Sequence, residues 1–227
     1  MDASERVFAE LRTYLTTGRP DLELLSYYRG VPFVYKAMAW RIREGQIIFA
    51  VQPPASALLK PNEKAILLCE SLLDPIQAKV VALDLRAGLV EMGDFSYASS
   101  KASSRREMRI EPETYYDVEL ARGDFVLKGM ICDISMSGIG VIVNDVEHFA
   151  QSDILRLAIH LPTGVGRMRG KIVKVTKSGA DYRLAVEFTG VPIEKIPIIR
   201  YIIELREKIR VEVHNMYAAA VSRAQPL

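Results

Sequence analysis

The sequence predicts a mainly β protein, built of two small antiparallel barrels and a long C-terminal helix. Two series of short β-branched or aromatic runs are separated by turn residues, as antiparallel strands are. A stretch of small polar residues divides the two series. The end of the chain then changes to a helical period. Together these observations favour a chain of two domains.

The first series follows a short amphipathic helix. Residues 5–16 alternate apolar and polar at helical spacing, with Val7, Leu11 and Leu15 on one face, and Gly18-Arg19-Pro20 ends the pattern. From about Leu24 to Tyr97 the chain is strand-like, with turns at Gly45, Asn62 and Gly88. The clearest runs are 31–35, 46–51, 65–68, 78–83 and 89–92, and a short helix is expected at 55–59. This pattern is typical of a small antiparallel barrel.

The polar segment marks the domain boundary. Residues 96–104 read Ser-Tyr-Ala-Ser-Ser-Lys-Ala-Ser-Ser, which offers almost nothing to bury. We therefore predict a first domain over 1–97, a linker over 98–104 and a second domain over 105–227.

The second series is more closely spaced than the first. Hairpin turns are expected at Arg122-Gly123-Asp124 and Lys177-Ser178-Gly179. The expected strands are 115–120, 125–134, 140–143, 154–161, 166–176 and 182–188. Short strands at such spacing indicate a closed or nearly closed barrel.

A long helix is expected over about 197–224, beginning at Pro197, which suits a first helical turn. Its apolar stripe consists of Ile198, Ile202, Leu205, Ile209, Val213 and Met216. The stripe either covers the second barrel or forms a coiled-coil seam with a second copy of the chain, and the sequence leaves both open.

Composition excludes several classes of protein. The net charge of the 227 residues is only +2, which argues against a nucleic-acid binder. The N-terminus lacks the pattern of a signal peptide and no apolar run is long enough to cross a bilayer, so we expect a cytoplasmic protein without membrane insertion. Cys69 and Cys132 are isolated, and the three histidines lack metal-ligand spacing, so no metal site is expected.

Two segments carry the chemistry of the second domain. The first is Arg105-x-x-x-Arg109, and the second is Asp133-x-Ser135-x-x-Gly138 between two strands. Together they resemble the signature of the PilZ family, an RxxxR motif followed by (D/N)xSxxG. The resemblance implies a β-barrel that binds cyclic di-GMP and needs no cofactor.

The residue types suit a ligand with two phosphates and two guanines. The planar guanidinium of Arg105 or Arg109 can bind phosphate, grip O6 and N7 of guanine, or stack on a purine. Asp133 offers an acceptor, and Ser135 a hydroxyl and an amide. Gly138 permits a tight turn and close approach of the backbone. Arg106 is included as a binding residue, because a doubled arginine recurs in the family that the chain resembles.

The order of the domains resembles the two-domain flagellar-brake (YcgR-like) type. That resemblance implies an N-terminal split barrel, a ligand site at the interdomain edge whose occupation reorients the domains, and a protein partner such as a component of the flagellar motor, in motility or biofilm control. No catalytic residue is assigned and no enzyme activity is expected. Two alternatives stay open: an adaptor that works through protein contacts without ligand, and an enzyme that holds a flavin in its N-terminal barrel.

Two further side chains are expected to pack rather than to bind. Cys132 precedes Asp133 on a strand, so its thiol should point to the opposite face and be buried. Trp40 lies in a largely apolar stretch and is expected in the core.

Overall fold

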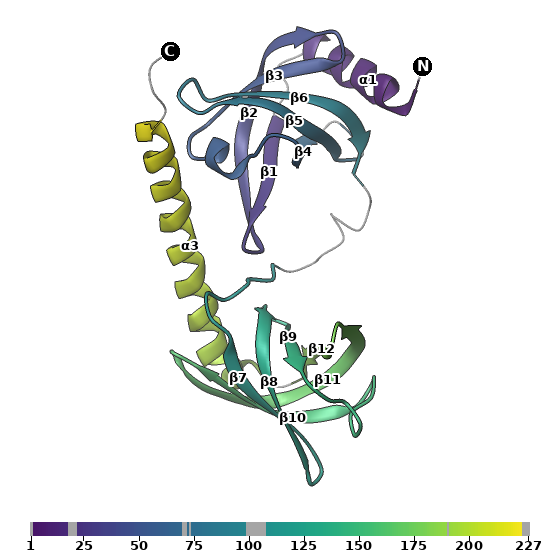
Figure 1. The fold of residues 1–227 in the computed structure, drawn as a ribbon, viewed down its shortest axis with the longest axis vertical. Helices are drawn as coiled ribbons and strands as arrows, with labels where there is room; N and C mark the ends of the chain where they lie inside the picture. The colour runs from purple at the N-terminus through teal and green to yellow at the C-terminus, as the bar shows by residue number, and fades with distance from the viewer. Residues whose placement is uncertain are drawn as a thin grey trace. The chain divides into compact units, whose positions relative to one another are not determined.

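The computed structural model describes residues 2–17, 22–69, 72, 74–98, 108–189 and 191–223. The strands in these ranges form two closed antiparallel barrels of six strands each, as the sequence predicts (Figure 1). The chain divides into two compact units. One comprises Met1–Tyr28, Pro32–Arg106 and Arg210–Leu227, and the other comprises Arg29–Val31 and Glu107–Ile209.

The first barrel has the strand order β1-β2-β3-β6-β5-β4. Its strands are β1 (Leu22–Tyr28), β2 (Val31–Arg43), β3 (Gln46–Val51), β4 (Lys64–Cys69), β5 (Ile76–Asp84) and β6 (Leu89–Tyr97). A single turn of 3₁₀-helix, η1 (Ala55–Leu58), stands where the sequence predicts a short helix.

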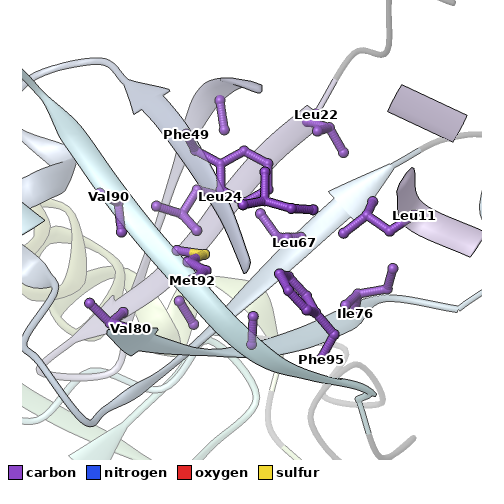
Figure 2. Close-up of a cluster of buried hydrophobic side chains, with 14 of the residues drawn as sticks. Leu11, Leu22, Leu24, Phe49, Leu67, Ile76, Val80, Val90, Met92 and Phe95 are labelled. Carbon is purple, nitrogen blue, oxygen red and sulfur yellow. The ribbon is translucent and has the colours of Figure 1, made fainter. Parts of the chain in front are cut away.

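Helix α1 (Ala3–Thr17) supplies part of the first core. Its N-terminus carries a reciprocal capping box, in which the amides of Asp2 and Glu5 each donate to the other's carboxylate at 2.8 Å. Val7 and Leu11 are buried among the inward-facing residues of the barrel. Figure 2 shows the labelled members of this cluster, drawn from α1 and from strands around the barrel: Leu11, Leu22, Leu24, Phe49, Leu67, Ile76, Val80, Val90, Met92 and Phe95.

Trp40 lies outside this core, and the prediction that it packs inside was wrong. On β2 the buried residues Val31, Phe33 and Ala37 alternate with outward-facing ones, and Trp40 falls in the outward set with 63% of its surface exposed. The pairing of β2 with β3 also shifts register between Ala39 and Arg41. The side on which this indole lies is therefore set by alternation along the strand. The apolar character of the neighbouring residues does not predict it.

The second barrel has the strand order β10-β11-β12-β9-β8-β7. Its strands are β7 (Tyr116–Arg122), β8 (Phe125–Ile134), β9 (Gly138–Val143), β10 (Ile154–Leu161), β11 (Gly164–Ser178) and β12 (Asp181–Phe188). Outside these strands, Ile110 forms an isolated antiparallel bridge with Ile134, the last residue of β8. This bridge fixes the chain segment that enters the barrel against the end of β8.

After a 3₁₀ turn, η2 (Pro192–Lys195), comes the long helix α3 (Ile196–Arg223), which confirms the predicted helix. Ile198, Ile202 and Leu205 are buried. The ring of Tyr201 packs edge-on against Tyr116 of β7, with centroids 5.3 Å apart, and Thr163 donates a hydrogen bond of 2.7 Å to the carbonyl of Pro197. This part of the stripe therefore covers the second barrel, and the alternative of a seam with a second copy stays untested.

Two predictions fall partly or wholly outside the described residues. The linker over 98–104 is described only at Ala98, so the predicted domain boundary remains a prediction. Arg105 and Arg106 also lie outside the described residues. Of the helices in the described ranges, none combines the length and the apolar character that crossing a membrane requires. The same ranges hold no group of three or more His, Cys, Asp or Glu arranged to bind a metal.

Candidate functional site

The turn between β8 and β9 is built around Ser135. The Ser135 amide donates to the carbonyl of Gly138 at 2.8 Å, and the Ser135 hydroxyl donates to the same carbonyl at 3.1 Å. The hydroxyl oxygen also accepts a bond of 3.1 Å from the Gly138 amide. Ser135 is buried, so these bonds satisfy groups that would otherwise be costly to withdraw from water. The serine of the motif therefore holds the turn together.

Gly138 is required here by close packing. A Cβ on this residue would stand 2.3 Å from the carbonyl oxygen of Val186 on β12, closer than any real contact. From the sequence we expected Gly138 to allow a tight turn and close approach of the backbone. The close approach shown by the structure is that of the neighbouring strand.

Asp133 is buried at the end of β8 and contacts two guanidinium groups. Arg109 Nη1 lies 3.2 Å from Asp133 Oδ1, and Arg183 of β12 pairs with Oδ2. A buried carboxylate is costly unless it is paired and hydrogen-bonded, and here each oxygen has its own arginine. Asp133 therefore orients both arginines at one edge of the barrel.

Arg183 is a site residue that the sequence analysis missed. Burial disfavours its charge, but the hydrogen bonds and charges of Asp133 and Cys132 together outweigh that effect and raise the pKa of Arg183 above its ordinary value. On β12 it occupies an outward position, where an arginine is usually a solvated charge. Only the pairing of β12 with β9 brings it beside Asp133, so no local signal distinguishes it.

Gly140 makes the room for the Asp133 carboxylate and was also missed. It lies directly opposite Asp133 in the pairing of β8 with β9. The sequence does show glycines at positions 138 and 140 of one strand, and a glycine inside a strand often marks close approach of another group. That pattern is the one signal that could have identified it.

The prediction that the Cys132 thiol points to the face opposite Asp133 was wrong. The β8–β9 pairing shifts register between Ile131 and Asp133, so alternation breaks at this residue. The half-buried thiol lies 3.7 Å from Asp133 Oδ2, on the same side as the carboxylate. Burial raises the pKa of the Cys132 thiol. Its place beside Asp133 makes it part of the site wall.

A pocket of about 380 Å³ opens beside Asp133, within the second unit. One wall is the segment that follows the Ile110 bridge, and the other comes from β8 and β12. The lining residues are Glu111, Pro112, Glu113, Thr114, Tyr115, Cys132, Asp133 and Arg183. Of the acidic residues in this lining, Asp133 pairs with Arg109 and Arg183, and Glu113 pairs with Arg29.

Of the six predicted binding residues, four are described, and all four lie around the end of β8. Arg109 and Asp133 are in direct contact, while Ser135 and Gly138 hold the adjoining turn. Arg105 and Arg106 are outside the described residues, so their positions are not part of this geometry.

Comparison with known proteins gives a family match and several similar folds. Residues 103–204 match the family model described as PilZ domain. No curated protein matches the chain significantly. Among solved structures, YcgR of Escherichia coli in complex with c-di-GMP is 15% identical, with a TM-score of 0.45, over 92% of this chain and 93% of that one.

Two other solved structures are similar over comparable lengths. The K. pneumonia MrkH–c-di-GMP complex is 14% identical, with a TM-score of 0.47, over 93% of this chain and 98% of that one. The Bacillus subtilis inhibitor of motility, MotI/DgrA, is 13% identical, with a TM-score of 0.43, over 84% of this chain and 97% of that one.

Proposed function

Because this chain belongs to the PilZ domain family through residues 103–204, we propose that it is a receptor for cyclic di-GMP. The ligand binds at the edge of the second barrel where Arg109 and Arg183 flank Asp133. The single observation that supports this best is the double pairing of Asp133, which holds two guanidinium groups at the family motif. Guanidinium groups suit both the phosphates and the guanine edges of such a ligand.

Arg105 and Arg109 of the motif bind the ligand through their positive charges, and Arg106 binds it next to them. Asp133 orients Arg109, and Ser135 and Gly138 keep the turn in shape. The protein acts by binding, without catalysing a reaction, and it uses no cofactor.

The output is control of a protein partner, in motility or biofilm formation, through a change in the arrangement of the two domains. The polar composition before Arg105 supports this, because such a segment can reorder when the ligand is bound. Small-angle scattering with and without cyclic di-GMP tests this step. Identical scattering curves at saturating ligand would contradict it.

The binding itself is tested by calorimetric titration of cyclic di-GMP into the wild type and into Arg105→Ala, Arg109→Ala and Asp133→Ala. We expect binding in the micromolar range or tighter in the wild type. Loss of a desolvated charged contact should cost about 2 to 5 kcal/mol in the arginine variants. Absence of heat in the wild type would favour the ligand-independent adaptor, and unchanged affinity in both arginine variants would refute the site.

A further inference from the structure

The outer side of the second barrel gathers three exposed arginines: Arg156 on β10, and Arg167 and Arg169 on β11. They border a cavity of about 380 Å³ within the second unit, which shares no lining residue with the pocket beside Asp133. We propose that these three residues, the arginine face, are the docking surface for an acidic segment of a protein partner. The inference rests on the proposed function for the role of that partner, and it adds the surface and the chemistry that bind the partner.

Charged residues near the arginine face are placed opposite charges of the other sign. Glu119 of β7 lies directly opposite Lys128 of β8, and their charged groups are 3.8 Å apart. Lys171 of β11 lies directly opposite Glu187 of β12. Such pairs stabilise an antiparallel sheet, because directly opposite side chains on one side of the sheet are close together.

The arginine face departs from this pattern. Arg156 lies directly opposite Arg169, and like charges in that relation destabilise a sheet. Arg167 lies two residues from Arg169 on the same side of β11, so the three side chains are neighbours. The strand register therefore concentrates positive charge here, and a bound group with negative charge would relieve the repulsion.

The three arginines keep most of their hydrogen-bond donors for a ligand. In the part of the chain that the structure describes, the side chains of Arg167 and Arg169 form no ion pair and no hydrogen bond. Arg156 donates to the carbonyl of Gly123 at 3.3 Å. Because a guanidinium has five N–H donors, this one bond leaves most of them available.

The carboxylates that line the cavity do not neutralise the arginine face. The lining includes Glu119, which is paired with Lys128, and Glu194 of η2. Among the described residues, Glu194 forms no ion pair, with these arginines or with any other cation. Three guanidinium groups therefore stand against one unpaired carboxylate, and the cavity keeps a positive charge.

The floor of the cavity is apolar. Ala121 of β7 and Ala158 of β10 line it, and each lies directly opposite one of the arginines, Ala121 opposite Arg156 and Ala158 opposite Arg167. Val126 of β8, opposite Ala121, adds an apolar side chain that is 60% exposed. The short alanines beside long arginines leave a hollow that can receive an apolar side chain between cations.

This combination suits an acidic protein segment better than a small anion or a nucleic acid. Guanidinium groups bind carboxylates in a bidentate way, and arginines beside apolar surface are typical of protein interfaces. A free polyphosphate would use the arginines but not the apolar floor. A nucleic acid is disfavoured by the net charge of only +2 for the whole chain. The fitting ligand is a segment with carboxylates on both sides of an apolar side chain.

The test is an NMR titration of the full chain with labelled alanine and valine methyl groups, in which Ala121, Ala158 and Val126 report on the cavity. The first probe is a blocked peptide of one leucine with two glutamates on each side. In the second peptide, glutamines replace the glutamates, and the third probe is inorganic tripolyphosphate. Calorimetric titration of cyclic di-GMP into the same proteins monitors the motif site separately.

The variants are the pair Arg167→Gln with Arg169→Gln and, as a matched control, the pair Lys174→Gln with Lys177→Gln. The control lies on the same strand, removes the same charge and changes exposed residues outside the cavity lining. Circular dichroism verifies that both proteins are folded.

We expect the glutamate peptide to shift the three reporter signals of the wild type in a saturable way, and the glutamine peptide to leave them unchanged. The arginine pair of substitutions should weaken the glutamate peptide about tenfold, because each exposed charge contact is worth a factor of a few. The control pair should bind the peptide as the wild type does. Cyclic di-GMP should bind all three proteins equally.

Four results would overturn the docking surface: no saturable shift with the glutamate peptide at millimolar concentration, equal shifts with the glutamine peptide, shifts with tripolyphosphate alone, or an equal loss in both variants. The third would show a general anion site, and the fourth an effect of net charge. If the wild type binds the glutamate peptide at these residues but binds no cyclic di-GMP, the receptor function is refuted and the docking surface stands, as that of a ligand-independent adaptor.

Discussion

Asp133 and Gly140 face each other across β8 and β9, and a Cβ on Gly140 would stand 2.2 Å from the Asp133 Oδ2 atom. The oxygen that pairs with Arg183 therefore occupies the space that a side chain at position 140 would fill. The buried position of the Asp133 carboxylate therefore requires a glycine at position 140.

Gly140→Ala should displace the Asp133 carboxylate from both arginines. Overpacking of a well-filled site typically costs about 1 to 3 kcal/mol, so urea denaturation should show a loss of that size. Affinity for cyclic di-GMP should fall as well, because the ion pairs with Arg109 and Arg183 are broken. The matched control is Gly166→Ala, whose Cβ would make an ordinary contact of 3.5 Å with Ile198. Equal stability of the two variants would contradict the close packing at Gly140.

Ser135→Ala should destabilise the turn even without ligand. The change removes the partner of the buried Gly138 amide, and leaving a buried donor unsatisfied costs about 1 to 3 kcal/mol. The free energy of unfolding from urea titration measures the loss. Ser137→Ala serves as the comparison, since the Ser137 hydroxyl lies 3.5 Å from that of Ser135 and has no other bond among the described residues. A Ser137→Ala loss as large as that of Ser135→Ala would show that the Ser135 bonds are not what holds the turn.

The sequence predicts those parts of the site whose residues are close together along the chain. Ser135 and Gly138 bond within one turn, and a motif that spans a turn is visible in consecutive residues. Arg183 reaches Asp133 from a strand that is distant along the chain. This contact depends on strand register, which a single sequence does not specify.

The two wrong orientations have a related cause. Cys132 lies where the pairing of its strand shifts register, and the position of such a shift is set by the neighbouring strand. Trp40 was assigned to the core from the apolar character of its segment, yet alternation from Ala37 to Met38 and Trp40 turns it outward. The number and order of the barrels were predictable, because they need only the strand pattern and the turns.

Ile198→Ala on α3 should destabilise the second barrel. Ile198 is fully buried, and removing its side chain leaves a cavity whose typical cost is about 2 to 5 kcal/mol. Ile203→Ala on the same helix removes a side chain that is half exposed, so its effect should stay within about 0.5 kcal/mol. Thermal or urea unfolding compares the two. Similar losses in both variants would mean that the helix does not cover the barrel as described.

Trp40 provides its own test, since it is the only tryptophan of the chain. With 63% of its surface exposed, its fluorescence should resemble that of a solvated indole and be readily quenched by acrylamide. Unfolding in urea should shift the emission only slightly. A strongly blue-shifted emission that resists quenching in the native protein would contradict the outward orientation.

Cys132 should react with iodoacetamide only at more alkaline pH than an ordinary thiol. The thiolate is the reactive form, and burial raises the pKa of Cys132 in the folded chain. The folded state therefore favours the neutral thiol, and the unfolded chain ionises at lower pH. Stability should consequently fall as the pH rises through the ordinary thiol range, and Cys132→Ala should show less of this fall in urea titrations.

The same thiol also reports on the ligand site, because Cys132 lines the pocket beside Asp133. Mass spectrometry after alkylation distinguishes it from Cys69 of the first barrel. Saturating cyclic di-GMP should slow modification of Cys132 and leave that of Cys69 unchanged. Equal protection of both cysteines would point to a global change in stability, and no protection of Cys132 would place the ligand away from this wall.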